Sequence, residues 1–220
     1  MNIVEIIYRK TMNCKIITIA QQKGGAGKTT IAAHLAIALS QRKYNIALID
    51  IDPQGTLTQW HKLRENFLGK SYTDINFHST SGWRITTELA KFKSTADFII
   101  IDSPPHTNTE TKSSVRISDL VIIPIQPSPA DLWASNATIN ICQKEQITFY
   151  TLLNRASQNS RLVKEIRSKM IKPLKSEIGN RVSFASCFME GLCVTEVQPR
   201  SIAAKEFKKL TTEILTKIKE

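Results

Sequence analysis

Cysteine is scarce in this 220-residue chain, and the cysteines it has are scattered. None of them forms a CxxC pair and no histidine cluster accompanies them; they are Cys14, Cys142, Cys187 and Cys193. A zinc site or a disulfide framework is therefore not expected. The pattern is typical of reduced cysteines in a cytosolic protein.

Long apolar runs are also lacking. No stretch approaches the roughly 18–20 apolar residues that cross a bilayer. The start of the chain has no basic region before its apolar residues, and Arg9 and Lys10 interrupt them, so a signal peptide is not expected. A second methionine, Met12, directly precedes the first clear strand. Residues 1–12 are therefore interpreted as a disordered lead or as an extension outside the natural chain, and residues 13–220 as one domain.

Acidic residues are outnumbered. The 19 Asp and Glu stand against 30 Lys and Arg, which gives a net charge of +11. Such an excess favours a polyanionic partner, either nucleic acid or an anionic membrane surface. No repeat, low-complexity tract or Pro/Gly-rich linker divides the chain, and its length suits one well-buried α/β domain.

Short apolar strands alternate with longer helical stretches along the chain. The predicted strands are 15–20, 45–50, 97–102, 120–124 and 147–153, and the predicted helices are 29–42, 82–93, 129–142, 161–172 and 202–219. Strand cores such as Phe98-Ile99-Ile100-Ile101 are apolar on consecutive residues, as strands covered by helices on both faces require. This order predicts a doubly wound, mostly parallel α/β sheet whose ligands bind at the carboxyl ends of the strands.

A glycine-rich loop follows the first predicted strand. It reads Gln22-Lys23-Gly24-Gly25-Ala26-Gly27-Lys28-Thr29-Thr30 and leads into a helix. The glycines let the backbone fold tightly, so several N–H groups converge on phosphate oxygens at the positive end of the helix dipole. Lys28 can reach the β- and γ-phosphates of a nucleotide, and the Thr29 hydroxyl can ligate Mg²⁺. An ordinary Gly-rich turn is the alternative, and Gly-Lys-Thr between a strand and a helix argues against it.

Two departures from the standard P-loop make this loop specific. Position 22 holds Gln where that pattern has Gly, and Lys23 is an additional lysine. Lys-Gly-Gly-x-Gly-Lys-Thr-Thr resembles the altered P-loop of the ParA/MinD family of ATPases. The resemblance implies that residues 23–30 bind ATP or ADP, that Lys28 and Lys23 serve catalysis, and that Lys23 crosses a dimer interface to touch the partner's nucleotide. A second cation so close to Lys28 would be costly without a further anion to meet.

Two carboxylates follow the second predicted strand, in Asp50-Ile51-Asp52-Pro53-Gln54. Residues two apart on an extended chain point the same way, so the pair can hold Mg²⁺ and orient a water for in-line attack on a γ-phosphate. A cap of the next turn is the alternative reading. The segment resembles the second motif of the ParA family, which implies that Asp52 orients the water and that Asp50 lies near Mg²⁺.

A third acidic residue ends the strand Ile99-Ile100-Ile101-Asp102, which runs into Ser103-Pro104-Pro105. Apolar residues followed by Asp form the Walker B arrangement, in which the carboxylate reaches Mg²⁺ directly or through water. The Asp-x-Pro-Pro ending is again similar to the ParA family. The predicted magnesium residues are therefore Thr29, Asp50 and Asp102.

Three later segments also resemble that family. The segment 123–131 resembles the one that lines the dimer face of small plasmid ParA proteins, although a simple strand–helix connection explains its prolines equally well. The resemblance implies that Asn154 contacts the adenine base, and a side-chain amide suits that edge. The segment 191–196 and Pro199 resemble the family's C-terminal segment, whose loop lies near the base.

The resemblance covers nearly the whole chain after Met12 and is closest to the compact ParF-like partition ATPases, which lack an N-terminal helix-turn-helix domain. It implies a slow ATPase in which ATP and Mg²⁺ close a homodimer. The dimer would bind duplex DNA without sequence preference and would partition plasmid or chromosomal DNA, or position other cargo. A ParB-like partner would stimulate hydrolysis, and the protein would be cytoplasmic and associated with the nucleoid.

One segment concentrates the positive charge. Between residues 155 and 175, seven Lys and Arg stand against Glu165 alone, a run that favours the phosphate backbone of duplex DNA. The alternative function is membrane association of the MinD type, which needs a free terminal amphipathic helix. The apolar residues at 207, 210, 214 and 218 have helical spacing, which more often means packing on a core. No membrane partner is therefore predicted.

Overall fold

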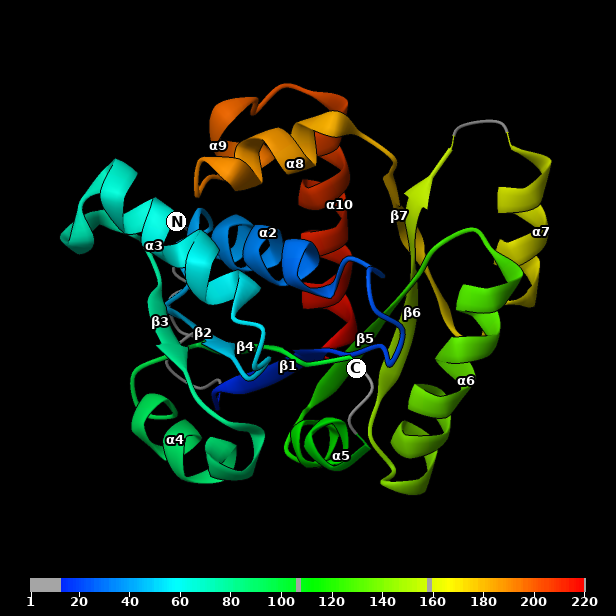
Figure 1. Ribbon diagram of the computed structural model, residues 1–220, viewed down its shortest axis with the longest axis horizontal. Coiled ribbons are helices and arrows are strands. Elements are labelled where there is room, and N and C mark those ends of the chain that lie inside the picture. The colour runs from blue at the N-terminus through cyan, green and yellow to red at the C-terminus, as the bar shows by residue number, and fades with distance from the viewer. Residues whose placement is uncertain (1–12, 106–107, 158–159, 220) are drawn as a thin grey trace.

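A seven-stranded sheet forms the centre of the computed structural model, which describes residues 13–105, 108–157 and 160–219 (Figure 1). The segment 1–12, interpreted above as a lead, lies outside the described residues. The strands are β1 (Lys15–Ile19), β2 (Ile46–Asp50), β3 (Asn76–Ser79), β4 (Phe98–Asp102), β5 (Leu120–Ile125), β6 (Phe149–Ala156) and β7 (Pro173–Gly179). Their order is β3-β2-β4-β1-β5-β6-β7 and every pairing is parallel.

Helices cover both faces of the sheet (Figure 1). One face carries α2 (Lys28–Ser40), α3 (Thr56–Leu68), α8 (Val182–Met189), α9 (Val194–Val197) and α10 (Ile202–Lys217). The other carries α4 (Ile85–Phe92), α5 (Asn108–Arg116), α6 (Pro129–Lys144) and α7 (Arg161–Lys169). Short 3-10 turns are η1 (Lys70–Tyr72) and η2 (Gly82–Arg84). The doubly wound parallel fold predicted from the sequence is confirmed.

Alternate residues of each central strand pack against opposite layers. In β5, Leu120 and Ile122 pack on the α2 side, whereas Val121 and Ile123 pack on the α6 side. All four are buried, which explains why the strand is apolar without alternation.

The two edge strands and several helices are missing from the sequence prediction. β3 is half exposed, and β7 alternates, with Lys175 and Glu177 exposed, so neither has an apolar run. The prediction also omits α3, α5, α8 and α9. In α3 two polar side chains, His61 and Arg64, occupy buried positions and interrupt the apolar spacing. The helix predicted over 161–172 ends at Lys169, because the chain turns there into β7.

A buried ion pair joins α3 to the segment before α10. The Arg64 guanidinium is fully buried and donates to both carboxylate oxygens of Glu196, at 3.0 and 2.7 Å. It also donates to the carbonyl of Gly191 at 3.2 Å, and it lies 5.7 Å from the ring of buried Trp60. A Cβ at Gly191 would lie 2.2 Å from the Arg64 backbone nitrogen, so only glycine allows this approach. Unlike the buried Trp60, the Trp83 side chain in η2 is 76% exposed.

His34 in α2 predicts a pH dependence of stability. Its ring is fully buried between Phe184 and Phe207, and burial lowers its pKa from 6.5 to about 4. Between these values the unfolded chain binds a proton that the folded chain does not, so the free energy of unfolding should rise with pH by about 1.4 kcal/mol per unit.

The measurement is the difference between wild type and His34→Leu in chemical unfolding at pH 4.5, 5.5 and 6.5, since other groups titrate in the same range. Wild type should lose more stability than the variant on acidification. Parallel curves would contradict a neutral, buried His34.

Candidate nucleotide-binding site

The glycine-rich loop connects β1 to α2 at the carboxyl edge of the sheet. Gly25 and Gly27 have φ values of 75° and 93°, in the left-handed region. Gly27 is the N-cap of α2 and has no side chain, so no side-chain cap occupies the first N–H groups of this helix. Free N–H groups at the positive end of a helix are an anion-binding arrangement.

Asn154, at the carboxyl end of β6, supports the loop from the side. Its Nδ2 donates to the carbonyl of Ala26 at 2.8 Å, and the residue is buried. A Cβ added to Gly27 would lie 2.3 Å from that nitrogen. The amide therefore fixes the loop backbone; its predicted contact with adenine stays a prediction.

Lys28 is the first residue of α2 and is almost completely buried, at 6% exposed. Burial lowers its pKa, and the carboxylates of Asp102 and Asp52 oppose that shift. The sequence-predicted lysine thus lies in the electrostatic range of two of the three predicted acidic residues. A buried ammonium at a helix N-terminus is placed to meet phosphate oxygens.

Asp102, the last residue of β4, is 1% exposed. Within the described residues, neither carboxylate oxygen meets a partner at full hydrogen-bond geometry. Burial raises its pKa to about 8; the neighbouring Thr29 hydroxyl and Lys28 oppose the shift, and Asp50 adds to it. Thr29 and Asp102, predicted separately from two motifs, are therefore neighbours. A desolvated carboxylate beside a hydroxyl is incomplete without a cation.

Asp50 and Asp52 form the turn that follows β2. Asp50 is fully buried, and burial raises its pKa. Its oxygens accept from the Asp52 N–H at 3.0 Å and from the Thr58 N–H and hydroxyl at 2.9 and 2.7 Å. Asp50 therefore caps α3 and shapes the turn, so the capping alternative holds for it. Asp52 accepts from the Gln54 N–H through Oδ1 alone in the described chain, at 3.0 Å.

These oxygen donors fit Mg²⁺ brought by a nucleotide better than a metal held by protein alone. In the described part of the chain, no group of three or more His, Cys, Asp and Glu could hold a metal ion. Mg²⁺ characteristically takes one or two protein oxygens, together with waters and substrate phosphates. The carboxylate of Asp102 and the neighbouring Thr29 hydroxyl supply that number, and a direct ligand role for Asp50 stays a prediction.

The connection between β5 and α6 also contacts the loop. Gln126 Nε2 donates to the carbonyl of Gly25 at 2.7 Å. Lys23 pairs with the Asp131 carboxylate in the first turn of α6. The sequence does not predict this pair, because it joins residues 108 positions apart. Trp133 follows on the same turn and is 69% exposed.

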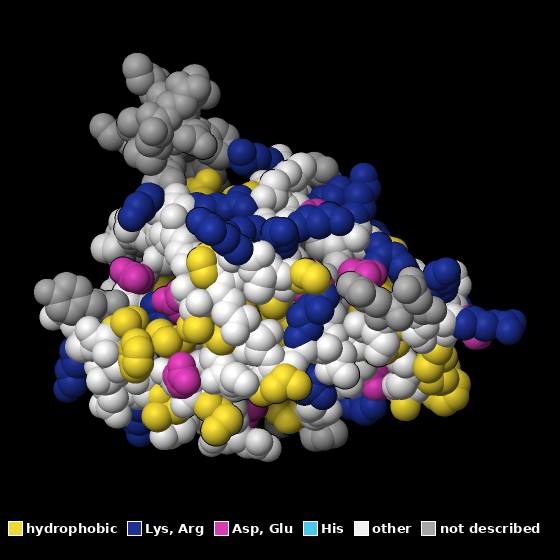
Figure 2. All heavy atoms as spheres, turned by 90° about the horizontal axis from the view of Figure 1, so that it is seen from above, with side chains coloured by type: hydrophobic (Ala, Val, Ile, Leu, Met, Phe, Trp, Pro, Cys, Tyr) yellow, Lys and Arg dark blue, Asp and Glu magenta, His cyan; other side chains and the backbone are white. Residues whose placement is uncertain are grey.

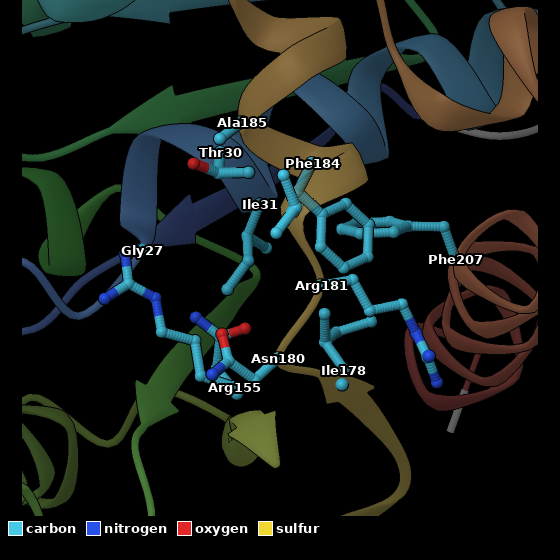
Figure 3. A pocket seen from close by; sticks show the side chains of 13 residues that line it. Gly27, Thr30, Ile31, Arg155, Ile178, Asn180, Arg181, Phe184, Ala185 and Phe207 are labelled. Carbon is cyan, nitrogen blue, oxygen red and sulfur yellow. The ribbon is translucent and has the colours of Figure 1, made fainter. Parts of the chain in front are cut away.

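A cavity of about 280 Å³ opens beside Gly27 and Thr30. Figure 3 shows Arg155 and Asn180 together on one side of it, and Ile31 and Phe184 across from them. Polar amides opposite an apolar wall suit a planar heterocycle.

One wall of this cavity comes from residues between 178 and 185, which run from the end of β7 through a short turn into the start of α8. The segment 191–196 and Pro199, predicted to lie near the base, do not line this cavity, and their place relative to a bound base stays a prediction. Gly191 and Glu196 pack against α3, because they receive the Arg64 side chain. Most of the cavity lining comes from β7, α8 and the turn between them, two elements that the sequence does not predict.

Comparison with known proteins gives one family. A family model described as "CobQ/CobB/MinD/ParA nucleotide binding domain" matches residues 17–219. The chain is 28% identical over 214 residues to the maintenance of carboxysome distribution protein A of Halothiobacillus neapolitanus, covering 90% of this chain and 95% of that protein. It is 25% identical over 247 residues to the sporulation initiation inhibitor protein Soj of Bacillus subtilis, covering 91% and 98%.

Solved structures share the fold. The septum site-determining protein MinD of Pyrococcus horikoshii, complexed with Mg-ADP, superposes with a TM-score of 0.78 at 21% identity, covering 94% of this chain and 99% of that one. A ParA family ATPase from Chlorobium tepidum superposes with a TM-score of 0.72 at 20% identity, covering 92% and 99%.

The interlock between Gly27 and Asn154 predicts unequal effects at two glycines of one loop. Gly27→Ala adds a steric clash with Asn154 to the strain of a positive φ, whereas a Cβ on Gly25 meets nothing within 4 Å. Gly25→Ala should therefore lower the free energy of unfolding by about 1–2 kcal/mol, and Gly27→Ala by clearly more. Chemical unfolding without nucleotide measures both. Equal losses would show that the Asn154 contact does not restrict position 27.

Proposed function

This chain belongs to the CobQ/CobB/MinD/ParA nucleotide-binding family, and on that premise we propose that it is a Mg-ATP-dependent, dimerising ATPase of the ParA type. Its proposed task is to partition plasmid or chromosomal DNA. Because one relative is named for the distribution of carboxysomes, positioning of another cargo along DNA is the second form of the proposal.

One observation carries this proposal: at the uncapped N-terminus of α2 a buried lysine lies near the buried Asp102 at the end of β4, whose oxygens meet no partner at full hydrogen-bond geometry among the described residues. Lys28 and Asp102 are 6% and 1% exposed, and loss of water disfavours the charged form of each side chain. A triphosphate with a divalent cation satisfies both at once, since phosphate oxygens meet the lysine and the cation meets the carboxylate.

The loop residues would bind the nucleotide phosphates. The backbone N–H groups from Lys23 to Thr30 and the Lys28 ammonium would supply the hydrogen bonds and the positive charge that phosphate oxygens need. Thr29 and Asp102 would hold Mg²⁺. When bound, this ion neutralises charge that develops on the phosphate oxygens during transfer.

Hydrolysis needs an oriented water, and Asp52 is the residue proposed to orient it. The carboxylate of Asp50 fixes the Asp52 N–H, and the turn closes with the Gly55 N–H bonded to the Asp52 carbonyl at 2.9 Å. Oδ1 of Asp52 accepts from Gln54, and the other oxygen is then the acceptor for the water proton.

The adenine base is proposed to occupy the cavity between Asn180 and Phe184. Asn154 fixes the loop that holds the phosphates, so one residue links base site and phosphate site. The Asn180 amide offers a donor and an acceptor, which match a purine edge. Lys23 would reach the nucleotide of a second subunit and close a homodimer, which a ParB-like partner would open by stimulating slow hydrolysis.

Non-specific duplex DNA is the proposed partner of the closed dimer, with the protein cytoplasmic and associated with the nucleoid. In the basic segment 155–175, Arg161 and Lys164 are exposed on α7. The Arg167 guanidinium is less available to DNA, because it donates to Glu177 at 3.0 Å and to the carbonyls of Leu174 and Lys175. The structure thus reduces the part of this segment available to DNA.

A second basic surface lies at the start of α10. Figure 2 shows Lys and Arg side chains in a band across the face that carries α8, α9 and the first turns of α10. Exposed basic residues of the first turns of that helix and its entry are Arg200, Lys205, Lys208 and Lys209. Either surface can bind phosphates by charge alone.

Membrane association of the MinD type is disfavoured by the packing of α10. Phe207, Leu210 and Ile214 are fully buried against the core. Exposing them to lipid would require this helix to leave the fold. No helix within the described ranges has the length and apolar character needed to span a membrane.

Asp52→Ala tests the catalytic assignment. ATP binding should persist, because ground-state phosphate contacts remain, while turnover should fall by about 10²-fold or more. The variant should accumulate as an ATP-bound dimer in sedimentation analysis. Lys28→Ala is the control, and it should lose ATP binding itself in calorimetry. Turnover of Asp52→Ala within a few-fold of wild type would remove Asp52 from its assigned role.

Two matched charge reversals test the DNA surface. Arg161→Glu with Lys164→Glu changes α7, and Lys205→Glu with Lys209→Glu makes the same change on α10. The pair that contacts DNA should lower the log–log salt slope of binding by about 0.9 for each lost phosphate contact, without affecting ATP binding. Binding to two unrelated duplexes is titrated with salt in the presence of ATP and Mg²⁺. Unchanged slopes for both variants would exclude both surfaces.

A further inference from the structure

Lys23, the lysine that distinguishes this loop from a standard P-loop, is paired within its own chain. Its ammonium contacts Oδ2 of Asp131, in the first turn of α6. The Lys23 side chain is 39% exposed, whereas that of Asp131 is 3% exposed. The pair therefore joins a solvent-facing cation to a carboxylate with almost no access to water.

The Asp131 carboxylate is fixed in place by the start of α6. The Ser128 hydroxyl donates to Oδ2, and the Asp131 N–H donates to the Ser128 oxygen at 3.1 Å. Oδ1 is buried and has no hydrogen-bond partner within the described residues. This carboxylate cannot follow Lys23 towards solvent, and Lys23 is the cation that the structure places against it.

The same connection restrains the loop at a second point. Gln126 donates to the carbonyl of Gly25, two residues beyond Lys23. Residues 126–131 thus hold the loop through its backbone and through its additional lysine. Such a double contact fixes where the Lys23 ammonium lies before any second subunit is present.

From this geometry we infer that Asp131 is a positioning residue that retains Lys23 on its own chain, so that dimerisation must first break the pair. The inference rests on the proposed function, because only a chain that dimerises on ATP offers Lys23 a second anion. Lys23 gives up its contact with Asp131 to reach a partner's phosphates, and a buried carboxylate is left without its cation. Asp131 therefore sets the protein concentration at which the ATP-bound dimer forms.

Asp131→Asn tests this inference in an Asp52→Ala background, in which ATP is retained. Asparagine keeps the shape and can still accept from the Ser128 hydroxyl, but it binds an ammonium more weakly than a carboxylate does. The dimer dissociation constant with Mg-ATP, measured by sedimentation, should fall by about tenfold, the worth of one charged hydrogen bond. In a Lys23→Ala background the same substitution should change it by less than about twofold.

A matched control comes from another lysine–aspartate pair. Asp119 contacts Lys15 at 3.2 Å, at the amino end of β1 and away from the loop. Asp119→Asn should leave the dimer dissociation constant unchanged. An Asp131→Asn dimer no tighter than its parent would overturn the inference while leaving the proposed function intact. A parent that does not dimerise with ATP would refute the proposed function and this inference with it.

Thermal unfolding without nucleotide checks the pair itself. Lys23→Ala leaves the Asp131 carboxylate buried without a cation and should lower the Tm, and Asp131→Asn added to it should restore most of that loss. A Lys23→Ala Tm equal to that of the double variant would show that the pair does not hold, and it would overturn the inference independently of dimerisation.

Discussion

Burial of charge at the carboxyl edge of the sheet is the constraint on which the rest of this structure depends. Lys28, Asp50 and Asp102 lie out of water, where each charged form is costly. The attraction between Lys28 and Asp102 offsets part of that cost, whereas Asp50 adds to it, and neither oxygen of Asp102 meets a partner at full hydrogen-bond geometry in the described chain. The fold therefore holds a site that is stabilised by the arrival of phosphates and a cation together.

Strand register brings these charges together. Asp50 and Asp102 lie opposite each other on β2 and β4, and Asp102 lies opposite Ile19, directly before the loop. Both helical layers are needed to exclude water from this edge, since β1, β2 and β4 are buried on both faces. The loop is then fixed laterally by Asn154 from β6 and by Gln126 after β5. The position of the phosphate-binding loop and its acidic neighbours thus depends on β2 and β4 on one side of β1 and on β5 and β6 on the other.

The sequence predicts the parts of the site that depend on local order and misses those that depend on distant packing. Lys28, Thr29 and Asp102 follow buried strands in recognisable motifs, and parallel strands must bring their carboxyl ends to one edge. The contact between Asn154 and Ala26, and the pair of Lys23 with Asp131, join residues more than a hundred positions apart. The cavity wall at 178–185 is not predicted from the sequence, because β7 has no apolar run to reveal it. From the sequence alone Arg167 belongs to the basic segment. Its pairing with Glu177 depends on the turn into β7, an edge strand that the sequence does not predict.

The three tryptophans of the chain lie in three different environments, and this makes them intrinsic fluorophores with separate meanings. Trp60 is buried beside Arg64, so its emission reports on the joint between α3 and α9. Trp83 is exposed, with the Arg84 guanidinium 4.8 Å from its ring, and provides a solvent-like background. Trp133 is exposed two residues beyond Asp131, on the turn that holds Lys23. A blue shift of its emission would record the covering of that turn in real time, without any attached dye.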